Sequence, residues 1–306
     1  MTRTRLRGVR IGGIEIGIEV PADCAWQWPD APIADFACLA REPEVHVGVR
    51  LGSVPQIDLE GERYSVPSGG TFEVKREGED WLLGLSVDGH RDLIARFDGE
   101  FGSGEVVISR ESPRAPFFPL AAPLAEWILV HRTVLHGGLC LRGIAIAVGG
   151  RTSIRLGEGA TAFASTTGWR RMSSIRSFSS AGANRRPMVL VREEDRRLRA
   201  YPTPWSEGGD LQLVEATAVA EVIGHSETAR VDRERLDPDE AAELLATHAV
   251  VPLSNEVLLD RVLCNARRLA GRTVVLRMGG GGRVAAAIDG QSAPLQCALG
   301  PPQSSL

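Results

Sequence analysis

The chain has 306 residues, of which 43% are hydrophobic, and a formal net charge of −4 at pH 7. This length and apolar content are enough to bury a full core in one large or two medium domains. The small negative charge, with arginines interspersed among acidic residues, provides no basic surface for nucleic acid or for an anionic membrane. We therefore expect a globular protein whose partners are neither nucleic acids nor membranes.

The first twenty residues predict no secretory signal, because glycines and glutamates interrupt their apolar positions. No other uncharged run approaches the ~20 residues that a membrane-spanning helix needs. The five cysteines are an odd number and include no C-x-x-C pair, which is typical of free thiols in a reducing compartment. These features predict a cytoplasmic protein without a disulfide framework or a metal site.

Residues 1–112 predict a β-rich N-terminal domain. Short stretches of alternating apolar and polar residues are separated by Gly, Asp and Pro turns, which is the pattern of antiparallel strands. These stretches are 10–20, 44–52, 71–78, 81–87, 92–97 and 104–110. Asp88 and Gly89 lie between two of them and predict a hairpin turn, which we prefer to a metal pair of Asp88 and His90. The segment 111–123 contains four prolines and marks the end of this domain.

Residues 113–290 mix strands with helices and form the second predicted domain. The first helix is expected at 124–134. The segment 237–250 begins with a capping box and a proline at the first helical position, and 255–270 carries an apolar stripe with helical spacing. The tail 291–306 has no periodicity and is expected to be loose. The fold class is thus α+β or α/β, with a β-rich N-terminal region and C-terminal helices.

An apolar run before Gly149 and Gly150 has the pattern of a buried strand that leads into a phosphate-binding loop. Four segments, the first of which contains this run, resemble in their order the HPr-kinase-related group of P-loop proteins. They are 135-LHGGLCLRGIAIAVGGR-151, 168-GWRRMSS-174, 201-YPTPWS-206 and 252-PLSNEVLLDRVLCNARRLAG-271. In that group a variable β-rich region precedes a kinase core similar to phosphoenolpyruvate carboxykinase. The resemblance therefore implies a P-loop core here.

The resemblance also implies where the phosphate-binding residues would lie. The first glycine of the loop motif falls on Gly150. The second glycine, the lysine and the hydroxyl residue are replaced by Arg155, Leu156 and Gly157. A leucine cannot neutralise phosphate charge, and a loop without the hydroxyl loses a magnesium ligand. The anion-binding remnant would then consist of Gly149, Gly150, Arg151, Arg155 and Gly157.

The other catalytic positions of the family are mostly lost as well. Its two aspartates fall on Ser174 and Ile175, so the metal and base carboxylates are missing. The only lysine, Lys75, lies in the β-rich region, where we expect it to be solvated. The family's catalytic histidine is retained as His136. A lone histidine on an apolar strand is also read as a hydrogen-bonded core residue, and that alternative stays open.

Two functional hypotheses follow. The preferred one is a catalytically degenerate HPr-kinase-like protein, a pseudokinase that binds a peptide or protein partner and needs no cofactor. Relatives in the group accompany biosynthetic genes for ribosomally made peptides, lasso peptides among them, so the resemblance gives the partner that context. Arg170, Arg171 and Trp205 are the candidate partner-binding residues, although we prefer a solvated arginine-rich surface as the explanation of the arginines. The kinases of the family assemble into hexamers, which leaves a homo-oligomer open.

The alternative hypothesis is an active ATP- and magnesium-dependent serine kinase with a remodelled loop. It would use Arg155 for the phosphates and His136 in catalysis. The two hypotheses differ in the environment of the loop residues. A pseudokinase predicts that Leu156 packs inward, whereas an active kinase predicts that Arg155 points into an open nucleotide pocket with a carboxylate such as Glu158 nearby.

Overall fold

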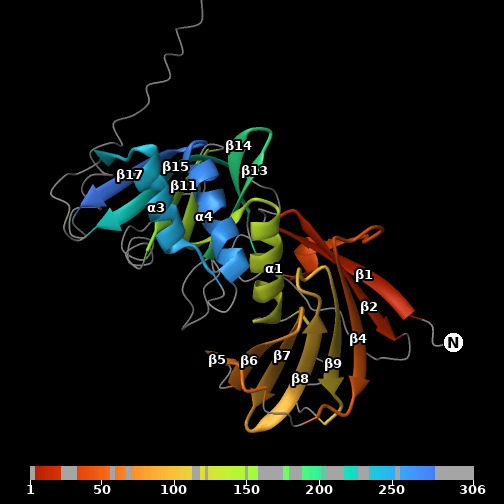
Figure 1. Cartoon of the computed structure of the whole chain (residues 1–306). Helices are drawn as coiled ribbons and strands as arrows, with labels where there is room; N and C mark the ends of the chain where they lie inside the picture. Colours follow the sequence, from red (N-terminus) through yellow and green to blue (C-terminus); the bar gives the residue numbers. More distant parts are fainter. Residues whose placement is uncertain are drawn as a thin grey trace, which may run out of the picture.

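The computed structural model describes residues 4–21, 33–55, 59–66, 70–111, 118–120, 123–148, 151–157, 175–178, 188–201, 203, 217–226, 234–251 and 256–279. Within these residues the chain forms a nine-stranded sheet, an eight-stranded sheet and a few helices (Figure 1). The prediction of a mixed α+β protein is confirmed. Among the described helices, none has the length and apolar character to span a membrane.

The first sheet contains every described strand before residue 110. Across the sheet the strands are β3 (Ala37–Cys38), β1 (Thr4–Ile11), β2 (Ile14–Pro21), β4 (Val45–Gly52), β9 (Ser103–Ser109), β8 (His90–Phe97), β7 (Asp80–Val87), β6 (Gly70–Glu77) and β5 (Glu62–Val66). A short 3-10 helix, η1 (Ile33–Phe36), precedes β3. The hairpin between β7 and β8 turns at Asp88 and Gly89, both with positive φ, as the sequence predicts.

The all-antiparallel arrangement expected for this region is wrong at one strand. β4 runs parallel to both of its neighbours, β2 and β9. Parallel neighbours need long connections rather than two-residue turns. The chain between β2 and β4 and the four strands between β4 and β9 provide them, and this spacing was the signal available in the sequence.

The second sheet follows the first helix, α1 (Leu124–Leu135). Its strands are β10 (Leu139–Val148), β11 (Arg151–Leu156), β12 (Ile175–Phe178), β13 (Met188–Glu194), β14 (Arg197–Tyr201), β15 (Thr217–Ser226), β16 (Glu234–Arg235) and β17 (Val274–Gly279). Two further helices, α3 (Pro238–His248) and α4 (Glu256–Ala270), pack on this sheet's core. All three predicted helices are therefore present.

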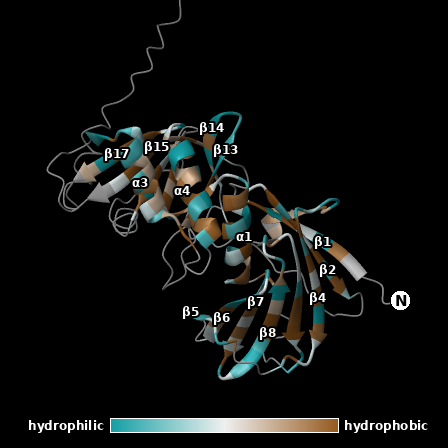
Figure 2. Ribbon diagram, in the orientation of Figure 1, coloured by the Kyte–Doolittle hydropathy of each residue, from teal (hydrophilic) through white to brown (hydrophobic). Residues whose placement is uncertain are grey.

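Helix α1 joins the two cores. Its buried Ile128 and Leu129 belong to the cluster that fills the first sheet, and Val134 near its end belongs to the cluster of the second sheet. Figure 1 shows α1 between the two sheets, and apolar residues line the strands that face it in Figure 2. The large side chains of Trp81 and Phe72 in the first sheet, and of Phe101 in the loop between β8 and β9, are also in the first cluster.

The ends of the helices follow the chemistry of their sequences. Asp237 accepts hydrogen bonds from the backbone N–H groups of Asp239 and Glu240, both at 2.9 Å, which confirms the predicted capping box of α3. Helix α1 ends at Leu135, and Gly137, two residues later, has a φ of +76°, which places it in the left-handed region. A side chain is strained in that conformation, so the glycine after His136 terminates the helix and sets the direction of the chain into β10.

Side chains of helix α4 donate hydrogen bonds to backbone carbonyls at and just after the end of α1. The side-chain amide of Asn265 donates to the carbonyl oxygens of Val134 at 2.8 Å and Gly138 at 3.0 Å, and Arg268 donates to that of Gly137. Carbonyls at the end of a helix lack partners within the helix, so these contacts satisfy groups that are otherwise costly to bury. They also hold α4 against α1.

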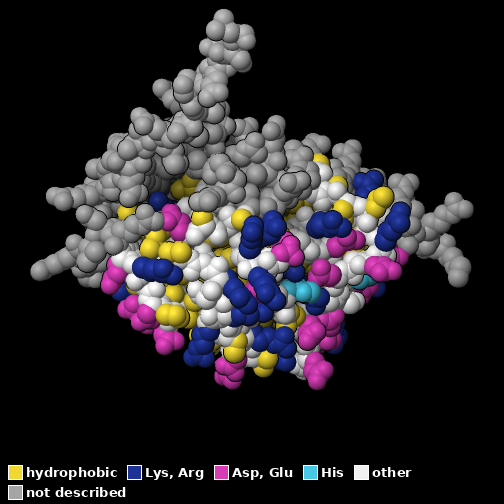
Figure 3. Space-filling model, turned by 90° about the horizontal axis from the view of Figure 1, so that it is seen from above, with side chains coloured by type: hydrophobic (Ala, Val, Ile, Leu, Met, Phe, Trp, Pro, Cys, Tyr) yellow, Lys and Arg dark blue, Asp and Glu magenta, His cyan; other side chains and the backbone are white. Residues whose placement is uncertain are grey.

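On the face shown in Figure 3, arginines and acidic side chains are mixed, as in the sequence.

Candidate functional site

The segment expected to be a phosphate loop contains a strand. Arg151–Leu156 forms β11, which pairs antiparallel with β10, with Val148 opposite Arg151 in the register. The other edge of β11 pairs in parallel with β15. Because hydrogen bonds to two neighbouring strands use the backbone groups of β11, these groups do not form a cradle for phosphate. The expectation of a loop is wrong for residues 151–156.

The buried positions of β11 explain this difference. Thr152, Ile154 and Leu156 are all buried, which matches the alternation of a strand packed against a core. The partner strand allows close approach at Gly143, where an added Cβ would lie 2.2 Å from the carbonyl oxygen of Arg155. The alternation was present in the sequence, but the two preceding glycines resembled the start of a phosphate loop.

The residues that replace the motif lie in β11 and directly after it. Leu156 is fully buried in the core of the second sheet. Arg155 is 8% exposed, and its Nη1 donates to Met278 Sδ at 3.2 Å. Gly157 has a φ of +87°, and its N–H donates to the carbonyl oxygen of Arg142 at 3.2 Å. The arginine beside the expected lysine position is thus buried against β17.

Several predicted site residues lie outside the described part of the chain. These are Gly149, Gly150, Glu158, Arg170, Arg171, Ser174 and Trp205. For Arg151 and Ile175 the structure describes the backbone only, as the first residues of β11 and β12. Lys75 lies in β6, opposite Leu82 of β7, within the first sheet. The predicted partner-binding role of the two arginines and Trp205 stays a prediction.

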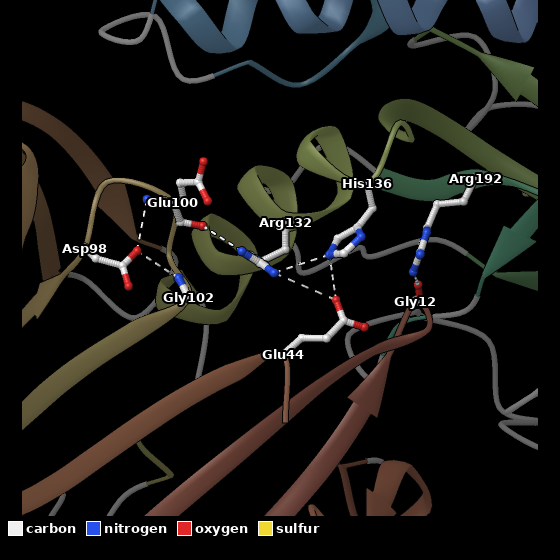
Figure 4. Close-up of polar contacts among 8 residues, drawn as sticks. All are labelled: Gly12, Glu44, Asp98, Glu100, Gly102, Arg132, His136 and Arg192. Carbon is white, nitrogen blue, oxygen red and sulfur yellow. Dashed lines mark hydrogen bonds and ion pairs between the residues drawn. The ribbon is translucent and has the colours of Figure 1, made fainter. Parts of the chain in front are cut away.

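His136 lies directly after α1 and contacts the first sheet. Its Nε2 is 2.6 Å from Oε2 of Glu44, the residue before β4 (Figure 4). Arg132, one turn earlier on α1, brings its Nη2 to 3.3 Å from the same nitrogen and to 4.0 Å from the same carboxylate oxygen. His136 is thus part of a charged cluster between the two sheets.

Burial and the charges of neighbouring side chains both shift the pKa of His136. Burial lowers the pKa of His136 below its usual value. The carboxylate of Glu44 opposes this shift, whereas the guanidinium groups of Arg192 and Arg132 add to it. Nε2 is the ring atom that contacts both the carboxylate of Glu44 and the guanidinium group of Arg132.

Two more polar contacts join the sheets near His136. Arg192 on β13 donates to the carbonyl oxygen of Gly12 in the turn between β1 and β2, at 2.9 Å. Arg132 also donates to the carbonyl oxygen of Glu100 in the loop between β8 and β9, at 3.4 Å. Figure 4 shows Arg192 extending from β13 toward Gly12, and Arg132 extending from α1 toward the loop between β8 and β9. The contacts of His136 therefore account for a structural role, and its catalytic role stays a prediction.

A second histidine, which the sequence did not single out, lines an open cavity of about 410 Å³. His131 lies on α1 and is 1% exposed. Its Nδ1 donates to the carbonyl oxygen of Trp127 at 2.9 Å, and its ring contacts those of Trp81 and Phe101. Burial lowers the pKa of His131 to about 4. A histidine on an apolar helix face gives no sequence signal for a cavity, because the cavity depends on neighbours distant in the chain.

The described residues include no group of three or more His, Cys, Asp or Glu side chains arranged to hold a metal ion. No protein-family model matches the sequence, and no curated protein matches it either. The candidate features are therefore the buried strand β11, the cluster around His136, and the cavity at His131.

The cluster around His136 predicts opposite effects of two substitutions. Glu44→Gln is expected to lower the pKa of His136 further, because the carboxylate stabilises the imidazolium. Arg192→Gln is expected to raise it and is the matched control. An NMR titration of the His136 imidazole measures both. A raised pKa in Glu44→Gln would contradict the contact between the two side chains.

The burial of His131 predicts a pH dependence of stability. The unfolded state, with a pKa near 6.5, binds more protons than the folded state, with a pKa of about 4. Stability is therefore complete above pH 6.5 and falls as the pH drops toward 4, by on the order of 3 kcal/mol. His131→Phe is expected to remove this dependence in urea unfolding at a series of pH values, whereas His90→Gln, at an exposed position, should keep it. Equal pH dependence in the wild type and His131→Phe would refute the assignment.

Proposed function

We propose that this chain is a catalytically degenerate HPr-kinase-like protein that binds a peptide or protein partner. The observation that carries the proposal is the burial of Leu156 in strand β11. This position is where the resemblance would place the phosphate-binding lysine. A buried leucine in a paired strand offers neither charge nor free backbone N–H groups to a phosphate.

The surroundings of Leu156 support the same proposal. Arg155, the nearest cation in the sequence, is buried and donates to Met278 on β17. His136 contacts Glu44 of the first sheet. An active kinase would need Arg155 at the phosphates and His136 at the reacting hydroxyl of the same substrate. Their contacts with different parts of the fold favour the pseudokinase over the active kinase.

Surface features are consistent with a protein partner. Helix α4 exposes three apolar side chains, those of Val257, Leu259 and Leu263. Leu259 and Leu263 are four residues apart and lie on one face of the helix, which is the spacing of a helical docking surface. The context of ribosomally made peptides comes from the resemblance, so the partner's identity is part of the proposal.

Isothermal titration calorimetry tests the loss of nucleotide binding. We expect no binding of ATP at about 1 mM, the upper end of usual enzyme KM values, with or without magnesium. The reason is that Leu156 and Gly157 occupy the positions where the resemblance would place the lysine and the hydroxyl residue. Binding of magnesium-ATP followed by transfer of phosphate to a serine peptide would overturn the proposal.

A stability measurement tests the burial of Leu156. Leu156→Ala is expected to lower the free energy of unfolding by about 2–5 kcal/mol, as for other large-to-small changes in a core. Leu259→Ala on α4 is the matched control, because this leucine is 45% exposed and should cost far less. Urea unfolding at neutral pH measures both. Equal small losses in the two variants would place Leu156 in an open loop and remove the main support for the proposal.

A further inference from the structure

The outward side of helix α4 exposes two neighbouring leucines. Buried side chains such as Leu258 and Val262 attach the helix to the core of the second sheet, so its other side faces away from that sheet (Figure 1). On that side Leu259 and Leu263 are 45% and 39% exposed. Leucines one helical turn apart form a surface that another helix can cover.

Opposite charges flank these leucines on the same side of the helix. Glu256 is the first residue of α4, Arg267 lies in its last turn, and both are exposed. From Glu256 through Leu259 and Leu263 to Arg267, the spacings are three, four and four residues, which place all four side chains on one side of a helix. We call these four residues the α4 stripe.

The two charges of the α4 stripe are not paired within the described part of the chain. Neither Glu256 nor Arg267 forms an ion pair with another described residue. By contrast, Arg268 of the same helix lies 3.9 Å from the carboxylate of Glu193 and donates to the carbonyl oxygen of Gly137. The charges of the stripe are therefore available to a second molecule.

The order of the stripe has a centre at Arg261. The midpoint of Leu259 and Leu263 is residue 261, and the midpoint of Glu256 and Arg267 lies between residues 261 and 262. Two antiparallel copies of α4, related by a two-fold axis at this level, place Leu259 of each copy opposite Leu263 of the other. A helix rises ~1.5 Å per residue, so the same axis brings Glu256 to within about 1.5 Å of the level of the other copy's Arg267.

This self-complementarity selects a second copy of the chain as the partner. One axis satisfies both the leucines and the charges, whereas a partner with another sequence needs no such relation among the positions of α4. Antiparallel helices also place the acidic first turn of each copy beside the basic last turn of the other. A two-fold axis closes the assembly at two chains.

We propose that two copies of this chain associate through antiparallel contact of their α4 stripes. Leu259 and Leu263 form the apolar centre of the contact, and Glu256 pairs with the other copy's Arg267 at each end. This inference rests on the proposed function in one respect, because it names the protein partner that the exposed leucines of α4 contact.

Sedimentation equilibrium of the whole chain at low ionic strength tests the association. A contact between single helices is smaller than a standard interface, so we expect a monomer–dimer equilibrium with a Kd of about 10–100 µM. Leu263→Ser is expected to weaken it about 10-fold or more, because symmetry removes two leucines from each dimer. Val257→Ser is the matched control, because Val257 is 62% exposed but lies outside the stripe, and it should keep the wild-type Kd. A wild type that stays monomeric, or equal Kd values in the two variants, would overturn the proposal.

Charge reversal tests the orientation of the two helices. Arg267→Glu and Glu256→Arg each place like charges at both ends of the contact and are expected to weaken it about fivefold or more. An equimolar mixture of the two single variants restores both ion pairs and should dimerise like the wild type. Arg261→Glu makes the same change in net charge at an exposed position outside the stripe, and it should keep the wild-type Kd.

The double variant Glu256→Arg/Arg267→Glu excludes an effect on the helix itself. It carries both unfavourable changes at the helix ends, yet its ion pairs are restored with their signs exchanged. We therefore expect it to regain the wild-type Kd. A double variant that associates no better than the single variants, or a mixture that fails to dimerise, would refute the antiparallel pair.

The ATP titration separates this inference from the proposed function. A chain that stays monomeric and binds no ATP would refute the pair of α4 helices and leave the loss of nucleotide binding intact. A dimer that binds magnesium-ATP and transfers phosphate to a serine peptide would refute the proposed function and support the pair.

Discussion

The burial of helix α1 between two sheets is the constraint on which the rest of the structure depends. One side of the helix adds Ile128 and Leu129 to the core of the first sheet, and its end adds Val134 to the core of the second. A helix that is apolar on more than one side must be covered on each of them. The hydrophobic effect on α1 therefore helps to hold the two sheets together, and Leu190 and Tyr201 of the second sheet belong to the first cluster as well.

The polar contacts around the end of α1 give that junction its specificity. Glu44, Gly12 and Glu100 belong to three separate turns or loops of the first sheet, and each contacts an arginine or His136 from the other side. Hydrogen bonds and ion pairs of this kind add modest free energy but penalise wrong alignments, because a displaced partner leaves a buried charge unpaired. The histidine that resembles a catalytic residue thus also determines how the two sheets meet.

Buried polar groups are treated differently in strand β11 and around His131. In β11, core packing places Leu156 and Arg155 inside, where strand pairing uses the backbone that a phosphate would need. At His131 the packing of aromatic rings instead surrounds a polar atom without pairing it. The first arrangement uses the backbone groups of β11 in strand pairing, and the second leaves the buried Nε2 of His131 without a hydrogen-bond partner among the described residues.

The sequence by itself determined the features that depend only on residues close together in the chain. Alternation predicted most strands of the first sheet, and Asp237 with its neighbours predicted the start of α3, because caps and strand faces are local chemistry. Only the tertiary structure decided that Arg151–Leu156 pairs as a strand on both edges, and that Glu44 meets His136. The cavity at His131 is also a tertiary property, because its walls come from residues that are far apart in the chain and no local pattern records which loops will meet.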